Sequence, residues 1–446
     1  MRLPWLFLSV ALFVGCGENP ESSTVSERDV VPAGNRTTAG SEPEAPGAAA
    51  KGDDQPLDST LRDLGNAVQL ATVPEQALSQ EELQAGWLQL FDGHTLFGWA
   101  ANSGANWEVR DGAIHCSGDE PGLLLTTVPF ADYELSCEIK LASGGNSGLF
   151  LRTQVNPQDP STDCYELNVC DSHKAFKTGG LVARQVASQV VAVEGAWHRY
   201  HVKLLGKRLT ARIDGQVVVK YEDATSRPLV DGRVGLQMNG GAVAFRRIRI
   251  RPLGLAPLFN GKDLAGWREV PGGKSRFSVR KGAIHVENGA GFLETERTFG
   301  DFVLQAEAKT NGENLNSGIF FRAERGTAEH PSNGYEVQIH NGMADGDGLT
   351  PSNAGTGAIF RRNTARCVMS RDREWCHLTL VATGPRMAVW VNGIQVTDWV
   401  DDRKPNANPR RGLRLDPGHL SLQGHDPTTN LDFRSLRASS SSGSSS

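Results

Sequence analysis

Beyond its first sixteen residues the chain lacks any long apolar run, and nowhere does it carry a strongly basic segment. A membrane-spanning helix needs about 20 apolar residues, so none is predicted after residue 16. With 46 Lys and Arg against 51 Asp and Glu, the net charge of −5 argues against nucleic acid as the main partner. Helical periodicity is also almost absent, while 50 glycines are typical of many tight turns between short strands.

The N-terminus has the pattern of an export signal. Arg2 supplies a positive charge, and the apolar run Leu3–Val14 is too short to span a membrane. Phe13-Val14-Gly15-Cys16 then resembles a bacterial lipoprotein cleavage box. We therefore predict a signal peptide over 1–16, lipidation of Cys16, and an exported protein anchored by lipid in the cell envelope or periplasm. The alternative is an ordinary secretory signal with an incidental cysteine.

Two polar segments flank the body of the chain. Residues 17–78 are rich in Ser, Pro, Gly, Glu and Ala, which predicts a disordered tether, with a weak helix expected over 57–78. Ser79 and Glu82 fit a capping box at the start of a short helix ending near Gly86. Residues 439–446 are predicted to form a flexible serine-rich tail.

An internal repeat is the strongest signal in the chain, because many short motifs return in the same order. It predicts one domain over 79–253 and a second over 254–438, with insertions in the second copy over 343–354 and 401–410. The matched segments are Leu90–Gly93 with Leu258–Gly261, Gly98-Trp99 with Gly266-Trp267, Gly112–His115 with Gly282–His285, Asn146–Arg152 with Asn316–Arg322, Tyr165-Glu166 with Tyr335-Glu336, and Leu236-Gln237 with Leu422-Gln423.

Within each copy, short segments alternate apolar and polar residues, as half-buried strands do. Asp214-Gly215 and Asn392-Gly393 lie between such segments and are typical two-residue hairpin turns. We therefore predict an all-β protein made of two tandem concanavalin-like jelly-roll β-sandwiches. The clearest alternating segments are Tyr133–Ile139, Leu209–Ile213, Phe302–Ala308 and Met387–Val391.

The six cysteines after Cys16 divide evenly between the copies, four in the first and two in the second. Cys164 and Cys170 flank a predicted strand, which would hold them about 20 Å apart, too far for a disulfide. A hairpin could bring Cys367 and Cys376 together. Free thiols throughout are the alternative, and both readings stay open.

The order and spacing of these motifs resemble the 3-keto-disaccharide hydrolase family over roughly 79–437. The second copy carries the resemblance best, through segments ending with Leu422-Gln423-Gly424-His425. The other segments are Gly282–Ile284, Asn316–Arg322, Tyr335–Ile339 and Thr356–Ile359.

This resemblance implies a concanavalin-like sandwich that acts on 3-keto-glucosides. The implied reaction is an elimination giving a 3-keto-2-hydroxyglucal, followed by its hydration. A ketone at C3 acidifies the proton on C2, so a side-chain base can remove it where the enolate oxygen is stabilised. A divalent metal ion is one candidate stabiliser, and the expected partner is an oligosaccharide or glycoside.

The second copy supplies the catalytic candidates. Glu336, Gln338 and His340 alternate along one strand and therefore share a sheet face. A solvated face without function is the alternative. Arg322 is either an enolate donor or a salt-bridge partner of Glu336. By the resemblance, His425 is the acid/base candidate. The predicted catalytic residues are His425, Glu336, His340 and Arg322; the predicted substrate-binding residues are Gln338, Asn316, Arg152 and Glu166.

The first copy departs from this pattern. It retains Arg152 and Glu166, but Asn168, Cys170 and Asn239 stand where the second copy has Gln338, His340 and His425. We therefore expect a degenerate first copy and an active second one. The competing hypothesis is a non-catalytic glycan-binding or cell-envelope module. Trp99 and Trp267 fit core packing better than sugar stacking.

Overall fold

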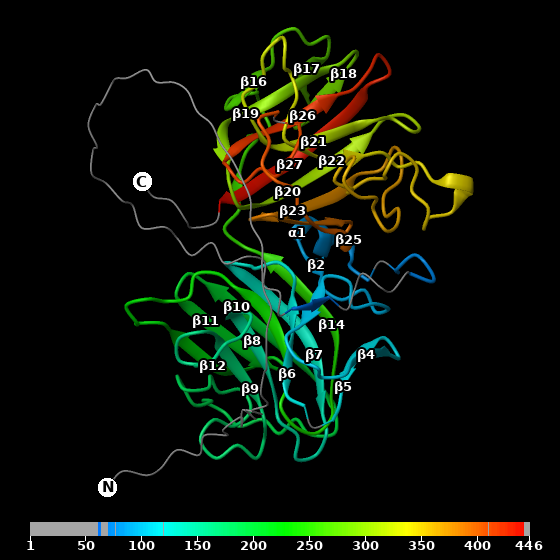
Figure 1. The fold of residues 1–446 in the computed structure, drawn as a ribbon. Coiled ribbons are helices and arrows are strands. Elements are labelled where there is room, and N and C mark those ends of the chain that lie inside the picture. The colour runs from blue at the N-terminus through cyan, green and yellow to red at the C-terminus, as the bar shows by residue number, and fades with distance from the viewer. Residues whose placement is uncertain (1–60, 64–69, 76, 119, 409, 441–446) are drawn as a thin grey trace, which may run out of the picture. The chain divides into compact units, whose positions relative to one another are not determined.

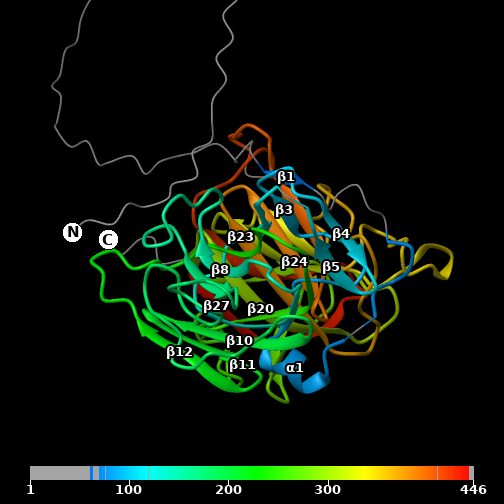
Figure 2. The ribbon, with the colours of Figure 1, turned by 90° about the horizontal axis from the view of Figure 1, so that it is seen from below.

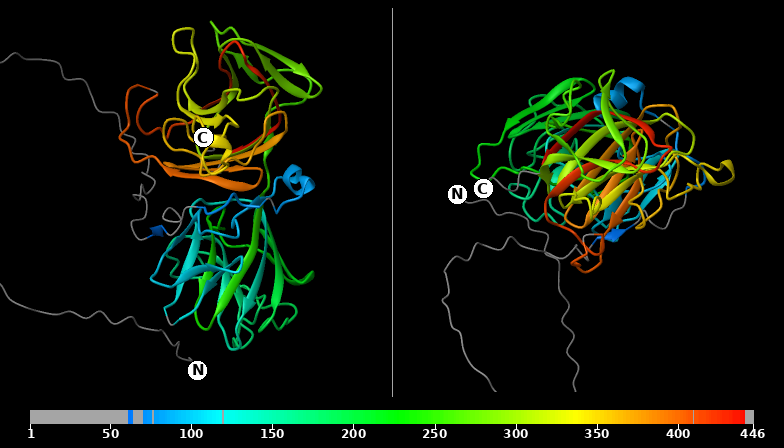
Figure 3. Two further views of the ribbon diagram at one scale, coloured as in Figure 1. Left: turned by 90° about the vertical axis from the view of Figure 1, so that its right-hand side faces the viewer. Right: turned by 90° about the horizontal axis from the view of Figure 1, so that it is seen from above.

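The computed structural model describes residues 61–63, 70–75, 77–118, 120–408 and 410–440. The predicted signal peptide, Cys16 and the tail residues 441–446 lie outside the described residues. Strands β3 to β14 build one β-sandwich and β16 to β27 a second (Figure 1), and Figures 2 and 3 show the ribbon from other sides. Two tandem sandwiches confirm the predicted fold class.

The first sandwich pairs a six-stranded sheet with an eight-stranded one. The six-stranded sheet has the order β1 (Arg62–Asp63), β3 (Trp99–Ala101), β6 (Gly122–Thr126), β13 (Arg233–Met238), β8 (Ser147–Thr153) and β9 (Tyr165–Val169). The other has the order β12 (Gln216–Glu222), β11 (Arg208–Ile213), β10 (Trp197–Leu205), β7 (Tyr133–Leu141), β14 (Val243–Pro252), β5 (Ala113–Cys116) and β4 (Trp107–Arg110), with β2 (Leu88–Gln89) beside β14.

The second sandwich repeats this strand order. Its five-stranded sheet is β16 (Trp267–Glu269), β19 (Gly291–Phe299), β26 (Gly418–Gly424), β21 (Ser317–Ala323) and β22 (Tyr335–Ile339). Its eight-stranded sheet is β17 (Arg276–Arg280), β18 (Ala283–Glu287), β27 (Asn430–Ser440), β20 (Phe302–Thr310), β23 (Cys376–Thr383), β24 (Arg386–Val391) and β25 (Ile394–Val400), with β15 (Ala256–Pro257) beside β27. A short 3₁₀ helix, Ala344–Gly346, follows β22.

The local signals of the sequence act as expected in three places. Asp214-Gly215 and Asn392-Gly393 turn tight hairpins with positive φ at both residues, as predicted. Helix α1 (Gln80–Ala85) begins at the predicted capping box, where Ser79 and Glu82 cap each other's backbone N–H groups.

The tryptophan that recurs in each copy belongs to the core of its sandwich. The indole of Trp99 donates to the Leu90 carbonyl at 2.6 Å, and that of Trp267 donates to the Leu258 carbonyl at 2.8 Å. Both rings are buried among the apolar side chains of their own sandwich. They are therefore packing residues, as favoured above, with little ring surface exposed for a sugar.

Two expectations are corrected, and one open alternative is decided. In the segment predicted as a tether, Arg62–Asp63 pairs with β3, and the described residues between 57 and 78 form no helix. The predicted tail begins too early, because Ser439 and Ser440 pair with β20 as the end of β27. All six described cysteines are buried free thiols, so Cys367 and Cys376 form no disulfide. Within the described residues, no helix is long and apolar enough to cross a membrane.

Candidate functional site

A cavity of about 620 Å³ opens on the five-stranded sheet of the second sandwich. Strand β22 contributes Glu336 to its floor, and the paired strand β21 contributes Phe320, which lies directly opposite Glu336. Strand β26 and the loop after it contribute Gln423 and His425. Loop residues complete the wall: Asn316, Ser332, Gly334, Phe360, Arg361, Arg362, Asn408, Arg410 and Arg411.

The Asn-Ser-Gly motif before β21 is explained by this floor. Asn316 lines the cavity, and the Ser317 hydroxyl donates to the Gln423 carbonyl at 2.7 Å, which ties β21 to β26. Gly318 is bare because the Glu336 side chain lies across it: a Cβ on Gly318 would meet Glu336 Oε1 at 2.5 Å. The motif therefore makes room for one carboxyl group.

Glu336 is the most unusual titratable group of the cavity. Its side chain is 8% exposed, and no described residue hydrogen-bonds its carboxyl group. Burial raises the pKa of Glu336 to about 7, against the opposing effect of the cationic Arg410 and Arg361 nearby. A carboxyl group that titrates near neutrality in a cavity suits a general base.

His425 lies at the exposed rim of the same cavity. Its Nδ1 is 2.8 Å from Asp426 Oδ2, and its backbone N–H donates to Thr429 Oγ1 at 2.9 Å. The Asp426 contact occupies Nδ1, which leaves Nε2 to exchange a proton with a ligand. This is the pairing that an imidazole acid/base needs.

Gln338 lies just behind the cavity. Its Nε2 donates to Asn316 Oδ1 at 3.2 Å and to the Asn353 carbonyl at 3.1 Å. It thereby holds the Asn316 side-chain amide in one orientation. Glu336, Asn316 and His425 are thus brought together as the sequence predicted, and Gln338 supports them.

Two predicted catalytic residues lie elsewhere. His340 follows the last residue of β22 and faces the Ser352 loop, with Nδ1 3.5 Å from the Ser352 hydroxyl. Burial lowers the pKa of His340, against the opposing effect of Asp372. His340 does not line the cavity, so its position does not support a catalytic role.

Arg322 is fully buried, with 0% exposure, and all its contacts are to the fold. Its guanidinium donates to Asp301 Oδ1 at 2.7 Å and to three carbonyl groups, those of Gly300, Gly384 and Arg414. The proposed salt bridge to Glu336 is therefore wrong: the partner is Asp301. Arg322 is placed to hold loops together rather than to meet a substrate.

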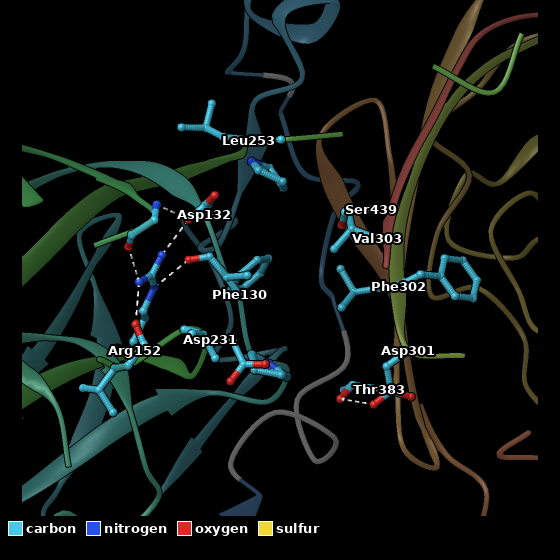
Figure 4. Close-up of a pocket in the computed structure, with 18 of the residues that line it drawn as sticks. Phe130, Asp132, Arg152, Asp231, Leu253, Asp301, Phe302, Val303, Thr383 and Ser439 are labelled. Carbon is cyan, nitrogen blue, oxygen red and sulfur yellow. Dashed lines mark hydrogen bonds and ion pairs between the residues drawn. The ribbon is translucent and has the colours of Figure 1, made fainter. Parts of the chain in front are cut away.

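Arg152 repeats this arrangement in the first sandwich. Its guanidinium donates to Asp132 Oδ1 at 2.7 Å and to the carbonyls of Ala131, Gly206 and Leu229 (Figure 4). The motif arginine is thus a loop clamp in both copies. The prediction that Arg152 binds substrate is not supported by its position.

Glu166 occupies the place of Glu336 in the first copy. Burial raises the pKa of Glu166 to about 7, against the opposing effect of a hydrogen bond from Gln237. The buried carboxyl group is therefore common to both copies. What differs lies around it, since Ala183 and Asn239 stand where the second copy has Arg361 and His425.

Four arginines of the cavity were missed from the sequence: Arg361, Arg362, Arg410 and Arg411. Two of them lie in or beside the insertion 401–410, which the repeat comparison did identify. For Arg410 and Arg411, the signal that could have found them is an insertion with adjacent basic residues in only one copy; Arg361 and Arg362 lie outside both insertions.

A divalent metal does not fit this cavity. The described residues hold no group of three or more His, Cys, Asp or Glu side chains arranged around one point. Glu336 is the one carboxylate among the lining residues, and it is accompanied by four guanidinium groups. Such a donor set repels a cation and supplies its own positive charge for an oxyanion.

Comparison with known proteins places both sandwiches. A family described as 3-keto-alpha-glucoside-1,2-lyase-like domain matches residues 86–251 and again 254–438. A 3-keto-disaccharide hydrolase of Bacteroides thetaiotaomicron is 25% identical, with 38% of this chain and 79% of that protein covered.

Solved structures give weaker likenesses. A putative glycosyl hydrolase from Parabacteroides distasonis is 20% identical with a TM-score of 0.35, and 40% of this chain and 99% of that one are covered. The carbohydrate-binding module CBM66 from Bacillus subtilis is 16% identical with a TM-score of 0.27, and 34% and 95% are covered.

Proposed function

Because the chain belongs to the family of 3-keto-alpha-glucoside-1,2-lyase-like domains, we propose that its second sandwich cleaves 3-keto-glucosides by elimination and hydration. The family and its named relative support a carbohydrate-active function of the 3-keto-disaccharide hydrolase type. The observation that carries the proposed chemistry is Glu336, a buried carboxyl group with its pKa raised to about 7 among arginines.

The proposed first step is removal of the C2 proton by the Glu336 carboxylate. The electron pair of the broken C2–H bond moves to the C3 ketone oxygen, giving an enolate. Arg361 and Arg410 are the cations that act on Glu336 itself, so they are placed to stabilise that oxygen. The enolate electrons then form a C1–C2 double bond and expel the glycosidic oxygen from C1.

The leaving oxygen requires a proton, which we assign to His425. The Asp426 carboxylate lies 2.8 Å from Nδ1 and holds the ring so that Nε2 is left to face the ligand. Hydration reverses the roles: neutral His425 takes a proton from water as the water oxygen adds to C1, and the electrons of the C1–C2 double bond move back to the C3 oxygen. The Glu336 carboxylic acid, whose proton exchanges with solvent, then protonates C2. Both groups therefore end in their starting states.

The direct test is incubation of the full protein with a 3-keto-disaccharide in deuterated water. We expect a released monosaccharide, a transient glucal product and deuterium at C2. Glycan binding without product or deuterium exchange would overturn the enzyme proposal and favour a binding module.

Gly318, which has no side chain where it faces Glu336, gives a second prediction. Gly318→Ala is expected to lower turnover by about 10²-fold. The new Cβ would lie 2.5 Å from Glu336 Oε1 and would push the carboxyl group out of position, and a shift of about 1 Å can cost that much. Steady-state rates on the 3-keto-disaccharide measure the loss. The matched control is Gly148→Ala in the first sandwich, where the nearest atoms, Gln237 Oε1 and Glu166 Cγ, lie at 3.1 and 3.4 Å. An unchanged rate in Gly318→Ala would contradict the placement of Glu336 as base.

A further inference from the structure

We propose that the sugar bound in the cavity of the second sandwich carries a permanent negative charge, as a carboxylate, sulfate or phosphate group. This inference deepens the proposed function, because it names the substrate class of the same site. It rests on the four guanidinium groups that line the cavity, on their lack of carboxylate ion pairs among the described residues, and on the first sandwich, where Ala183 replaces Arg361 and the counterpart of Arg362 is paired with Asp223.

The cationic groups outnumber the anionic ones. Arg361, Arg362, Arg410 and Arg411 line the cavity with Glu336 as the one carboxylate. Clefts lined by charge of one sign concentrate ligands of the opposite sign. Guanidinium groups in particular recognise carboxylate, sulfate and phosphate oxygens through paired N–H donors.

These arginines are not neutralised by the fold. Arg361 stacks on Phe360, with its guanidinium carbon 5.4 Å from the ring centre, and Arg362 donates to the backbone carbonyls of Arg361 and Arg410. No described carboxylate forms an ion pair with any of the four. Other arginines of the same sandwich are paired, as Arg386 is with Asp398 at 2.6 Å.

The proposed reaction does not need so much positive charge. Before proton transfer the single negative charge is on Glu336; after it, Glu336 is neutral and the enolate carries the charge. The total stays at one negative charge, which one or two guanidinium groups can balance. The remaining cations exceed what this reaction needs, and a ligand that brings another anion would pair with them in place of water.

The first sandwich shows that the fold itself does not require these side chains. Ala183 takes the place of Arg361 with the same left-handed backbone, φ 60° in both. The residue before each of these positions makes the same backbone hydrogen bond. Val182 N–H donates to the Glu166 carbonyl in the first sandwich, and Phe360 N–H donates to the Glu336 carbonyl in the second. The two copies therefore share this backbone, and only the second carries the arginine side chain.

The position of Arg362 also differs between the two sandwiches. Arg184, the counterpart of Arg362, is turned away to Asp223 at 3.5 Å and to the ring of Tyr165. In the second sandwich the equivalent residues are Tyr335 and Asp401, and Arg403 forms the ion pair with the aspartate. Arg362 is therefore not needed for that pair and lines the cavity.

A buried acceptor provides an independent sign of a polar ligand. Gln423 is 8% exposed and lines the cavity, and its Oε1 has no hydrogen-bond partner among the described residues. An unpartnered buried amide oxygen is costly unless a ligand donates to it. A sugar hydroxyl supplies such a donor while the charged group meets the arginines.

Binding of sugars that are not oxidised at C3 tests this without catalysis. The full protein is titrated calorimetrically with a neutral glucose disaccharide and with its glucuronate, sulfate and phosphate counterparts, at low and high salt. We expect at least one charged disaccharide to bind about tenfold or more tightly than the neutral one, with salt weakening the difference. The tightest of the three identifies the anionic group.

The variant Arg361→Ala/Arg410→Ala is expected to abolish that preference. Arg361→Ala restores the residue that the first sandwich carries at the same φ, so the backbone is unstrained. Arg276→Ala, an exposed arginine on β17 of the other sheet, is the control and should bind as the wild type does.

Equal binding of neutral and charged disaccharides, no binding of any of them, or an unchanged preference in the double variant would overturn the proposal. These outcomes are distinct from failure of the proposed function. That failure appears as absent turnover of a 3-keto-disaccharide, whatever the charge preference in binding.

Discussion

Glu336→Gln is expected to lower turnover of a 3-keto-disaccharide by about 10²–10⁴-fold, the usual contribution of a positioned general base. Glutamine keeps the shape that Gly318 accommodates, but its amide cannot accept the C2 proton. The substitution also removes a carboxyl group that burial disfavours in its charged form. The loss should therefore appear in the rate, and substrate affinity should change much less. Steady-state kinetics and C2 deuterium exchange both measure it.

The matched control is Glu166→Gln, which makes the same change on the same kind of strand in the first sandwich. Burial raises the pKa of Glu166 to about 7 as well, so the two variants are alike in every respect except their surroundings. We expect Glu166→Gln to retain the wild-type rate within about twofold. A reversed result, with Glu166→Gln inactive and Glu336→Gln active, would assign the chemistry to the first sandwich.

The pH dependence follows from the same shift. A base acts in its ionised form, so the rate should rise with pH through about 7, where Glu336 loses its proton. Stability should change in the opposite direction. Because the folded pKa lies above the ordinary value of about 4.5, the native state binds more protons, and it loses stability as pH rises from about 4.5 to 7. Glu336→Gln should remove the pH dependence of the rate and the part of the stability change that comes from Glu336, whereas Glu166 keeps its own part.

The fold could be predicted because its signals are local. The turn at Asp214-Gly215 needs positive φ at two residues, and the sequence supplies residues that adopt it. Alternation identifies the strands, and the repeat lets each copy check the other. Pairing between strands distant in sequence, such as β13 with β6 and β8, carries no local signal and had to come from the structure.

Among the residues of β21 and β22, the candidate site was predicted only where strand alternation holds, whereas Asn316 and His425 came from the family resemblance. Alternation holds along β22, so Glu336 and Gln338 share a face as expected. It fails at Arg322, whose φ of 47° lies at a register shift in β21 and redirects the side chain to Asp301. It also fails at His340, which lies beyond the last residue of the strand.

The arginines could not be assigned from the sequence because they lie on separate loops. Arg361 lies in the loop between β22 and β23, whereas Arg410 and Arg411 belong to the loop before β26. Their meeting depends on how both loops fold back over β22. The absence of an equivalent insertion in the first copy was the available clue, and it indicated a position without indicating a role.

Arg322→Met is expected to destabilise the second sandwich by about 3 kcal/mol, about 1 kcal/mol for each of the three carbonyl groups that lose a donor. Methionine matches the length of the side chain but removes its four bonds. The carbonyls of Gly300, Gly384 and Arg414, which are half-buried, then lose their donor. Asp301 keeps the backbone N–H of Gly384, at 2.9 Å, as a partner, so the larger part of the loss comes from the carbonyls. Denaturant unfolding of the full chain measures the shift.

The outcome separates a structural arginine from a catalytic one, since the sequence pattern allowed both. Arg152→Met removes the same set of bonds from the first sandwich, which we expect to be dispensable for turnover. Both variants should therefore lower stability to a similar extent. Turnover should fall in Arg322→Met only as far as the second sandwich unfolds, and stabilising conditions should restore it. A folded Arg322→Met protein with wild-type stability and no turnover would return Arg322 to the catalytic residues and show that the four bonds around it are not what it is kept for.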